Sequence, residues 1–263
     1  MALVTLTTDF GLTDPFVGIM KGVLATRAPG VAVVDVTHGI PPQDVRAGAL
    51  VLRQSAPWFP AGTIHVAVID PGVGGTRRPI CVATAWACYL GPDNGVLSLA
   101  AEADGIRTVV ELTDPKFQLS PRSATFHGRD VFAPVAAALA TGTAPEALGP
   151  VVKDMTRLPF PEATHKGGEL HGQVVYVDHF GNLVTNVSRS ALEGFSGAKL
   201  SVTIRAIHVR GVATSYSSAQ PGQLVAVVNS WDLLEVAVRD GSARDRLRAG
   251  VGEAVIVRVD PLG

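Results

Sequence analysis

The apolar segments of the chain change their arrangement near residue 141. Before that point, short runs rich in β-branched residues alternate with longer segments of mixed polarity, whereas after it short runs follow one another. Strands are expected at 4–7, 31–36 and 64–69, and helices at 16–27, 42–56 and 128–140. This alternation predicts an N-terminal α/β domain with a largely parallel sheet.

The second part of the chain predicts a smaller all-β domain, either a sandwich or a barrel. Residues 141–168 hold four prolines and few helix or strand patterns, which is typical of a connection between domains. Beyond them, strands are expected at 172–178, 183–186, 200–205, 224–228, 233–238 and 254–259. The predicted division is an N-terminal domain at 1–150, a connection at 151–168 and a C-terminal domain at 169–263.

Composition limits the classes of function. A net charge of −1 over 263 residues gives no reason to expect broad binding to nucleic acid or to anionic membranes. Cys81 and Cys88 lack CxxC spacing and predict buried free thiols, which fit a reducing compartment. The chain shows no basic leader and no apolar run of ~18 residues, so a cytoplasmic protein is expected. Its histidines lack metal-ligand spacing, and we expect no metal and no cofactor.

Polar residues lie where ligand groups gather in α/β proteins. Asp9, Asp35 and Asp70 are placed at the ends of three expected strands, and parallel sheets bind ligands at the carboxyl ends of their strands. Arg77 follows Asp70, and His127 precedes an expected helix, so an acid, a cation and a titratable base occupy turns. Each also has a structural explanation, because Asp70 can bond its own turn, Arg77 can be a surface cation and His127 can cap the helix.

Six blocks, in the same order, resemble the S-adenosylmethionine (SAM) hydrolases, or SAM hydroxide adenosyltransferases, which are related to the SAM-dependent fluorinase and chlorinase. The blocks are TTDFGLTD (7–14, followed by Lys21-Gly22), VTHGI (36–40), DPGVGGTRR (70–78), GPDNG (91–95), FHGRD (126–130) and DHFGN (178–182). The resemblance covers nearly the whole chain. It implies an N-terminal α/β domain, a C-terminal β domain and a homotrimer, with active sites between the N-terminal domain of one subunit and the C-terminal domain of the next.

The resemblance also implies roles for individual residues. Asp70, Arg77 and His127 match the catalytic triad of the hydrolases, while Arg129 and Asp130 are interpreted as structural. The implied substrate contacts are Asp9 with the ribose hydroxyls, Asp178 with the α-ammonium of the methionine part, Phe180 stacked on adenine, Asn182 on the adenine edge and Ser230 near the methionine carboxylate, and Val238 is a further substrate-binding residue.

Some features of the expected substrate pocket stay open. From the residues alone, the 178–182 segment fits a β-turn equally well. Trp231 stands where the fluorinase has an arginine that holds the methionine carboxylate, and Gln43 stands where it has a tryptophan near the ligand. Trp231 therefore leaves open how the methionine carboxylate is held, and Gln43 leaves open how closely the sugar pocket is packed.

The nucleophile is predicted from the same resemblance. The halogenases have tyrosine at the positions of Asp70 and His127, and a carboxylate would repel a halide at close range. The fluorinase has serine at the position of Gly128, although the chlorinase has glycine there too. The leading hypothesis is therefore hydrolysis of SAM to adenosine and L-methionine. The alternatives are a chlorinase-like halogenase and a module that binds adenosine or SAM without turnover.

Overall fold

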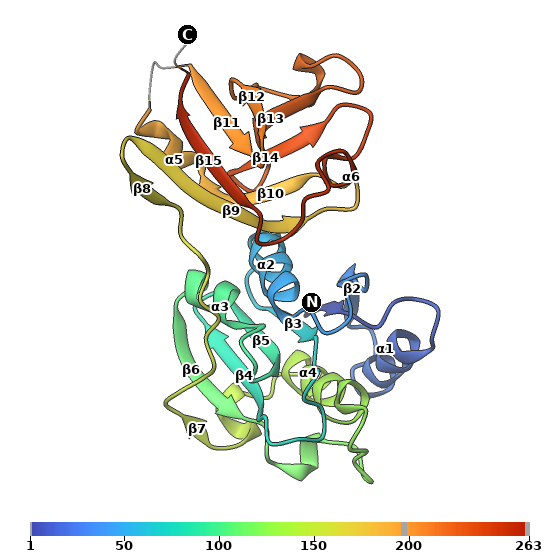
Figure 1. Ribbon diagram of the computed structural model, residues 1–263. Helices are drawn as coiled ribbons and strands as arrows, with labels where there is room; N and C mark the ends of the chain where they lie inside the picture. The colour runs from blue at the N-terminus through green and yellow to red at the C-terminus, as the bar shows by residue number, and fades with distance from the viewer. Residues whose placement is uncertain (1, 196–198, 261–263) are drawn as a thin grey trace. The chain divides into compact units, whose positions relative to one another are not determined.

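The computed structural model of the chain describes residues 2–195 and 199–260. The chain divides into two compact units, Met1–Pro159 and Phe160–Gly263, each with its own core (Figure 1). In the part of the chain that the structure describes, no helix is long and apolar enough to cross a membrane.

The N-terminal unit is built on a seven-stranded sheet in the order β2-β1-β3-β5-β4-β6-β7. Its strands are β1 (Leu3–Thr8), β2 (Ala32–Thr37), β3 (Thr63–Val68), β4 (Pro79–Thr84), β5 (Ala87–Pro92), β6 (Ile106–Glu111) and β7 (Val151–Val152). Strands β2, β1, β3 and β5 are parallel, whereas the pairings from β5 through β4 and β6 to β7 are antiparallel. The sheet is therefore mixed, and the prediction of a largely parallel sheet describes only its first half.

The change of direction has a local cause. Only two residues separate β4 from β5, and a two-residue connection can join only antiparallel strands. The Thr84 hydroxyl accepts hydrogen bonds from the backbone N–H groups of Trp86 and Ala87, which fixes this turn. No strand was expected from the sequence at the positions of β4, β5 and β6.

Helices cover the N-terminal sheet and close its core. They are α1 (Phe16–Arg27), α2 (Val45–Ser55), α3 (Ser98–Asp104) and α4 (Ala133–Ala140), the last preceded by a π-helical segment, Gly128–Phe132. Helix α1 packs against α4, and α2 packs against α3. The Asp44 carboxylate accepts from the Ala47 N–H and so caps α2, which begins later than the predicted residue 42. Cys81 is buried in this core, and both cysteines are free.

The C-terminal unit is an eight-stranded antiparallel sheet in the order β12-β11-β15-β9-β10-β14-β13, with β8 paired to β9. The strands are β8 (Thr164–Lys166), β9 (Glu169–Val177), β10 (Leu183–Ser188), β11 (Leu200–Ile204), β12 (Ile207–Arg210), β13 (Leu224–Val228), β14 (Leu233–Val238) and β15 (Ala254–Val259), with short helices α5 (Arg189–Glu193) and α6 (Ala243–Leu247). Because β12 also contacts β13, the sheet is nearly closed, which agrees with the predicted all-β domain.

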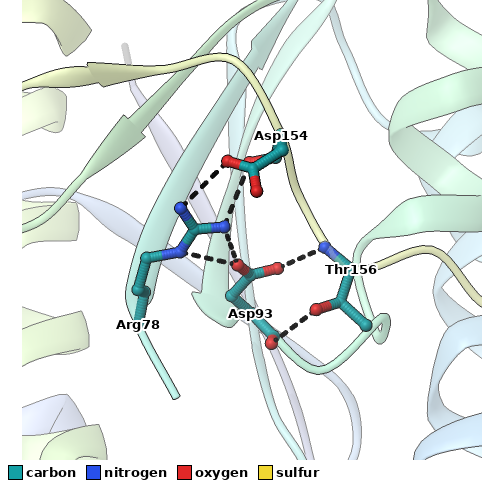
Figure 2. A network of polar contacts seen from close by, with 4 residues as sticks. All are labelled: Arg78, Asp93, Asp154 and Thr156. Atoms are coloured by element: carbon teal, nitrogen blue, oxygen red, sulfur yellow. Dashed lines mark hydrogen bonds and ion pairs between the residues drawn. The ribbon is translucent and has the colours of Figure 1, made fainter. Parts of the chain in front are cut away.

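A buried carboxylate anchors the segment that follows β7. Asp93 has only 4% of its side chain exposed, and its Oδ2 accepts from Nε of Arg78 at 2.9 Å. Its Oδ1 accepts from the backbone N–H of Thr156 at 2.6 Å, and the Arg78 guanidinium continues to Asp154 (Figure 2). Asp93 therefore joins the turn before β4 to residues 154–156. Residues 141–168, predicted to hold little regular structure, also contain β7, β8 and a 3-10 turn at Pro145–Leu148.

We expect Asp93→Asn to lower the free energy of unfolding by about 3 kcal/mol, because it removes one partner of a largely buried ion pair. Urea unfolding of the full chain measures this loss, and hydrogen exchange should show a less protected Thr156 amide. The control is Asp232→Asn, because the Asp232–Arg189 pair has side chains that are 74% and 57% exposed. An exposed pair contributes at most about 1 kcal/mol. Equal effects of the two variants would contradict the anchoring role of Asp93.

Candidate active site

Asp70, Arg77 and His127 come together in the N-terminal unit. Asp70 lies two residues beyond β3, Arg77 lies two residues before β4, and His127 immediately precedes the π-helical segment. Nε of Arg77 donates to Oδ1 of Asp70 at 2.9 Å, and Nη2 donates to Oδ2 of the same carboxylate. Nη2 also lies 2.7 Å from Nδ1 of His127. One guanidinium therefore joins an acid and an imidazole from segments far apart in the sequence.

The three structural explanations from the sequence do not describe these side chains. The Asp70 carboxylate faces Arg77, while the turn is closed by the Asp70 backbone carbonyl, which accepts from the Val73 N–H. Arg77 is not a surface cation, because only 10% of its side chain is exposed. The His127 side chain makes no capping hydrogen bond to the segment that follows it.

The contacts determine the protonation of His127. A guanidinium has only donors, so Nδ1 of His127 must accept from Arg77 and carry no proton. The ring is then the neutral tautomer with its proton on Nε2. Burial lowers the pKa of His127 below its ordinary value, and the charges of Arg77 and Arg122 lower it further, against the opposing effects of Asp70 and Asp130.

Two residues that the sequence analysis did not single out hold the Asp70 turn in place. The Asn94 side-chain amide donates to the carbonyl of Ile69 at 2.8 Å, next to Asp70. Gly74 has φ of +74°, and a Cβ there would lie 2.3 Å from the Ala124 carbonyl oxygen. The turn after Asp70 therefore packs directly on the segment that leads to His127, and only glycine fits. Asn94 lies in the GPDNG block, and the resemblance of that block to the SAM hydrolases was the signal in the sequence that could have identified it.

Asp9 lies at the same edge of the sheet as Asp70. It follows β1, whose residue Thr8 is in register with Val68 of the parallel strand β3. Oδ2 of Asp9 accepts from the backbone N–H of Gln43 at 2.8 Å. Asp35, in contrast, does not lie at a strand end as expected. It is inside β2, and its carboxylate contacts Nζ of Lys21 at 2.5 Å. Arg129 pairs with Asp130, whose carboxylate also accepts from the Ser123 N–H.

A cavity of about 650 Å³ in the C-terminal unit collects four of the six predicted substrate-binding residues. Those four are Asp178, Phe180, Asn182 and Val238. The Phe180 side chain is 72% exposed, so a ring face is available for a ligand. Tyr216 and Arg239 also line the cavity. Tyr216 was not predicted from the sequence, because it lies in a polar stretch without a recognisable pattern.

The 178–182 segment is indeed a turn. Oδ1 of Asp178 accepts from the N–H groups of Phe180 and Asn182, and Oδ2 accepts from the Asn182 side-chain amide. The turn interpretation and the binding interpretation are therefore compatible, because the carboxylate fixes the turn that presents the Phe180 ring.

Ser230 and Trp231 lie outside the lining of this cavity. Ser230 is exposed in the turn between β13 and β14. The Trp231 ring packs against Tyr176 with ring centroids 5.3 Å apart. The contact of Ser230 with a methionine carboxylate stays a prediction. Among the described residues, no group of three or more His, Cys, Asp or Glu side chains is placed to hold a metal ion.

Comparisons with known proteins agree with the resemblance seen in the sequence. A protein of Thermus thermophilus named (R)-S-adenosyl-L-methionine hydrolase is 44% identical over 258 residues, which cover 95% of this chain and 96% of that protein. A protein of an Actinoplanes species named fluorinase is 30% identical over 73% of each chain. The crystal structure of an uncharacterized conserved protein from Thermotoga maritima has a TM-score of 0.91 and 30% identity, covering 98% of this chain and 100% of that one.

The family models cover most of the sequence. Residues 4–149 match the N-terminal domain of the SAM hydroxide adenosyltransferases, and residues 172–256 match their C-terminal domain. With this coverage and with a relative at 44% identity, the chain belongs to the SAM hydroxide adenosyltransferase family.

Proposed function

We propose that this protein is an enzyme that hydrolyses SAM to adenosine and L-methionine, by attack of water or hydroxide on the ribose C5′ carbon. The observation that carries this proposal is the buried Arg77 guanidinium that holds both the Asp70 carboxylate and the neutral His127 ring. The name of the Thermus thermophilus relative supports the same activity.

The leaving group sets what the site must supply. The sulfur of SAM is a sulfonium, so it departs as a neutral thioether and needs neither a general acid nor a metal to assist it. We therefore propose an enzyme without metal or cofactor. What remains is to hold a nucleophile in line with C5′ and to limit the water around it.

Asp70 and His127 are placed to hold the attacking oxygen. Each Asp70 oxygen accepts one bond from Arg77 and keeps lone pairs that can accept from a water molecule. Nε2–H of His127 is a donor to the same water, because Arg77 occupies Nδ1. In this arrangement Arg77 pairs with the carboxylate, Asp70 is the acceptor for the proton of water, and His127 orients the oxygen.

The halogenase alternative conflicts with the charge of the site. A halide at the Asp70 oxygens would be repelled by the carboxylate, a repulsion that the paired Arg77 reduces, and it would find no hydrogen-bond donor on that carboxylate. Water carries no charge and can donate a hydrogen bond to the same carboxylate. The relation to proteins named fluorinase thus indicates shared SAM chemistry, whereas Asp70 favours a water nucleophile.

Substrate binding is assigned to both domains of the predicted division. We propose that Asp9 binds the ribose hydroxyls, that Asp178 binds the α-ammonium, and that Phe180 stacks on adenine. Asn182, Ser230 and Val238 complete the contacts. The family resemblance supports a homotrimer with each active site formed by the N-terminal domain of one subunit and the C-terminal domain of the next, and it supports a cytoplasmic enzyme.

The activity is tested by incubating pure protein with SAM and identifying the products by chromatography and mass spectrometry. We expect equal amounts of adenosine and methionine, with one atom of ¹⁸O in adenosine when the reaction is run in H₂¹⁸O. Parallel reactions with chloride or fluoride should give no 5′-halo-5′-deoxyadenosine. Halide-dependent product would support the halogenase, and bound but unreacted SAM would support a binding module.

Asp70→Asn serves as the control for this experiment. The amide retains the shape of Asp70 but is a poor proton acceptor, so we expect turnover to fall at least about 100-fold. SAM binding, measured by calorimetry, should change much less. Near-normal turnover of this variant would remove Asp70 from the chemistry.

The pKa of His127 gives a second expected outcome. Burial and Arg77 lower it below the ordinary value of ~6.5, so the ring should stay neutral at pH 7 and turnover should fall only as the pH drops below ~6.5. Arg77→Gln removes the nearest cation and leaves Asp70, so the pKa should rise. NMR titration of the ring measures this without activity. Arg122→Gln, which removes the more weakly acting cation, should give a smaller rise, and an unchanged pKa in Arg77→Gln would contradict the arrangement.

We expect Phe180→Ala to weaken adenosine binding about 10-fold, because stacking of a base on an aromatic ring contributes ~1–3 kcal/mol. Calorimetry with adenosine measures the dissociation constant, and Phe180→Tyr, which keeps the ring, is the matched control. The rate at saturating SAM should change little. Equal affinity of the alanine and tyrosine variants would contradict stacking on Phe180.

A further inference from the structure

Glu235 is a buried acid without an ion-pair partner. It lies in β14, a strand of otherwise apolar residues, and only 2% of its surface is exposed. None of the ion pairs among residues 2–195 and 199–260 includes it. Burial raises the pKa of Glu235, and the neighbouring charge of Asp178 raises it further. Burying a carboxylate costs free energy because the group loses its hydration, and an apolar residue at this position would not have that cost.

Two hydrogen bonds stabilise the Glu235 carboxylate. The Tyr216 hydroxyl donates to Oε1 at 2.8 Å, and Nδ2 of Asn229 donates to Oε2 at 2.9 Å. The orientation of the Asn229 amide follows from its other contacts, because its Oδ1 accepts from the backbone N–H groups of Trp231 and Leu233. Nδ2 therefore faces Glu235.

The two donors belong to segments that lie next to the substrate-binding residues. Tyr216 lines the same cavity as Asp178 and Phe180, and its segment is a single 3-10 turn at Tyr216–Ser218. Asn229 begins the turn that carries Ser230, between β13 and β14. Such short segments have few backbone hydrogen bonds of their own, so a rigid strand residue that holds both would limit their motion.

We propose that Glu235 is a positioning residue for substrate binding, which holds the Tyr216 ring in the cavity wall and fixes the Ser230 turn through its two hydrogen bonds. Glu235 itself is buried beneath these residues and acts through them. This inference rests on the proposed function, because it takes the cavity as the site for the nucleoside of SAM.

Two variants of Glu235 separate hydrogen bonding from charge. In Glu235→Gln, the amide oxygen accepts from Asn229 and the amide nitrogen donates to the Tyr216 oxygen, so both contacts persist without the charge. In Glu235→Met, a side chain of similar length makes neither contact. We expect the dissociation constant of adenosine and the KM for SAM to rise about 10-fold in the methionine variant and less than about 3-fold in the glutamine variant. The kcat should change little in both.

A double-mutant cycle with Tyr216→Phe tests the contact itself. This change keeps the ring and removes the hydroxyl, so it should weaken adenosine binding on its own and add little to Glu235→Met. It also provides the test if Glu235→Met does not fold. Thermal unfolding is measured for each variant, because the methionine variant loses a costly buried carboxylate but leaves the Tyr216 and Asn229 donors without their acceptor, and binding is compared only between variants that are folded.

The outcomes separate this inference from the proposed function. If the natural protein binds no adenosine and releases none from SAM, both fail. If the natural protein binds adenosine and releases it from SAM, and Glu235→Met binds adenosine equally well, only the positioning role is overturned. If Glu235→Gln weakens adenosine binding as much as Glu235→Met does, the positioning role is also overturned, because the charge of Glu235 rather than its hydrogen bonds would then matter. Weaker adenosine binding in Glu235→Met together with nearly normal binding in Glu235→Gln supports the positioning role.

Discussion

A buried guanidinium must have its charge balanced and its donors used, and Arg77 is such a group. The Asp70 carboxylate takes two of its N–H groups and the His127 ring takes a third contact. This single requirement fixes the hydrogen-bonding roles in the cluster, because the Asp70 oxygens must accept and Nδ1 of His127 must accept without carrying a proton. Arg78, the next residue, has a different role, since it pairs with Asp93 and anchors residues 154–156. Two adjacent arginines thus serve the candidate chemistry and the fold.

Local patterns predicted those parts of the fold that local contacts determine. The apolar periodicity of 16–27 and the strand runs beyond residue 169 correspond to α1 and to the C-terminal sheet. Strands β4 and β5 are buried on both faces, so they show no alternation, and only the turn at Thr84 sets their direction. Asp35 was misplaced because it already lay inside the expected strand 31–36, one residue before its end, and β2 continues to Thr37.

The candidate site was predictable to a different extent in its two parts. The grouping of Asp70, Arg77 and His127 was implied by the resemblance to the SAM hydrolases, and the structure brings the three side chains together. The supporting contacts of Asn94 and Glu235 were not predictable, because their partners are chosen by tertiary packing. A glutamate in an apolar strand is a visible anomaly in the sequence, but its two donors are identified only when β14, the Tyr216 turn and the Asn229 turn are seen together.

The charges of the C-terminal cavity bear on how strongly it binds substrate and products. Asp178 lines it and the buried Glu235 lies behind it, and no ion pair among the described residues uses either carboxylate, whereas the cavity's Arg239 contacts Asp240 and the Ala219 carbonyl. Under the proposed function, SAM brings two positive groups, an ammonium and a sulfonium. Breaking the bond between C5′ and sulfur removes the sulfonium charge. Under the proposed function, the attraction to these carboxylates is therefore stronger for SAM than for either product, which favours release of adenosine and methionine.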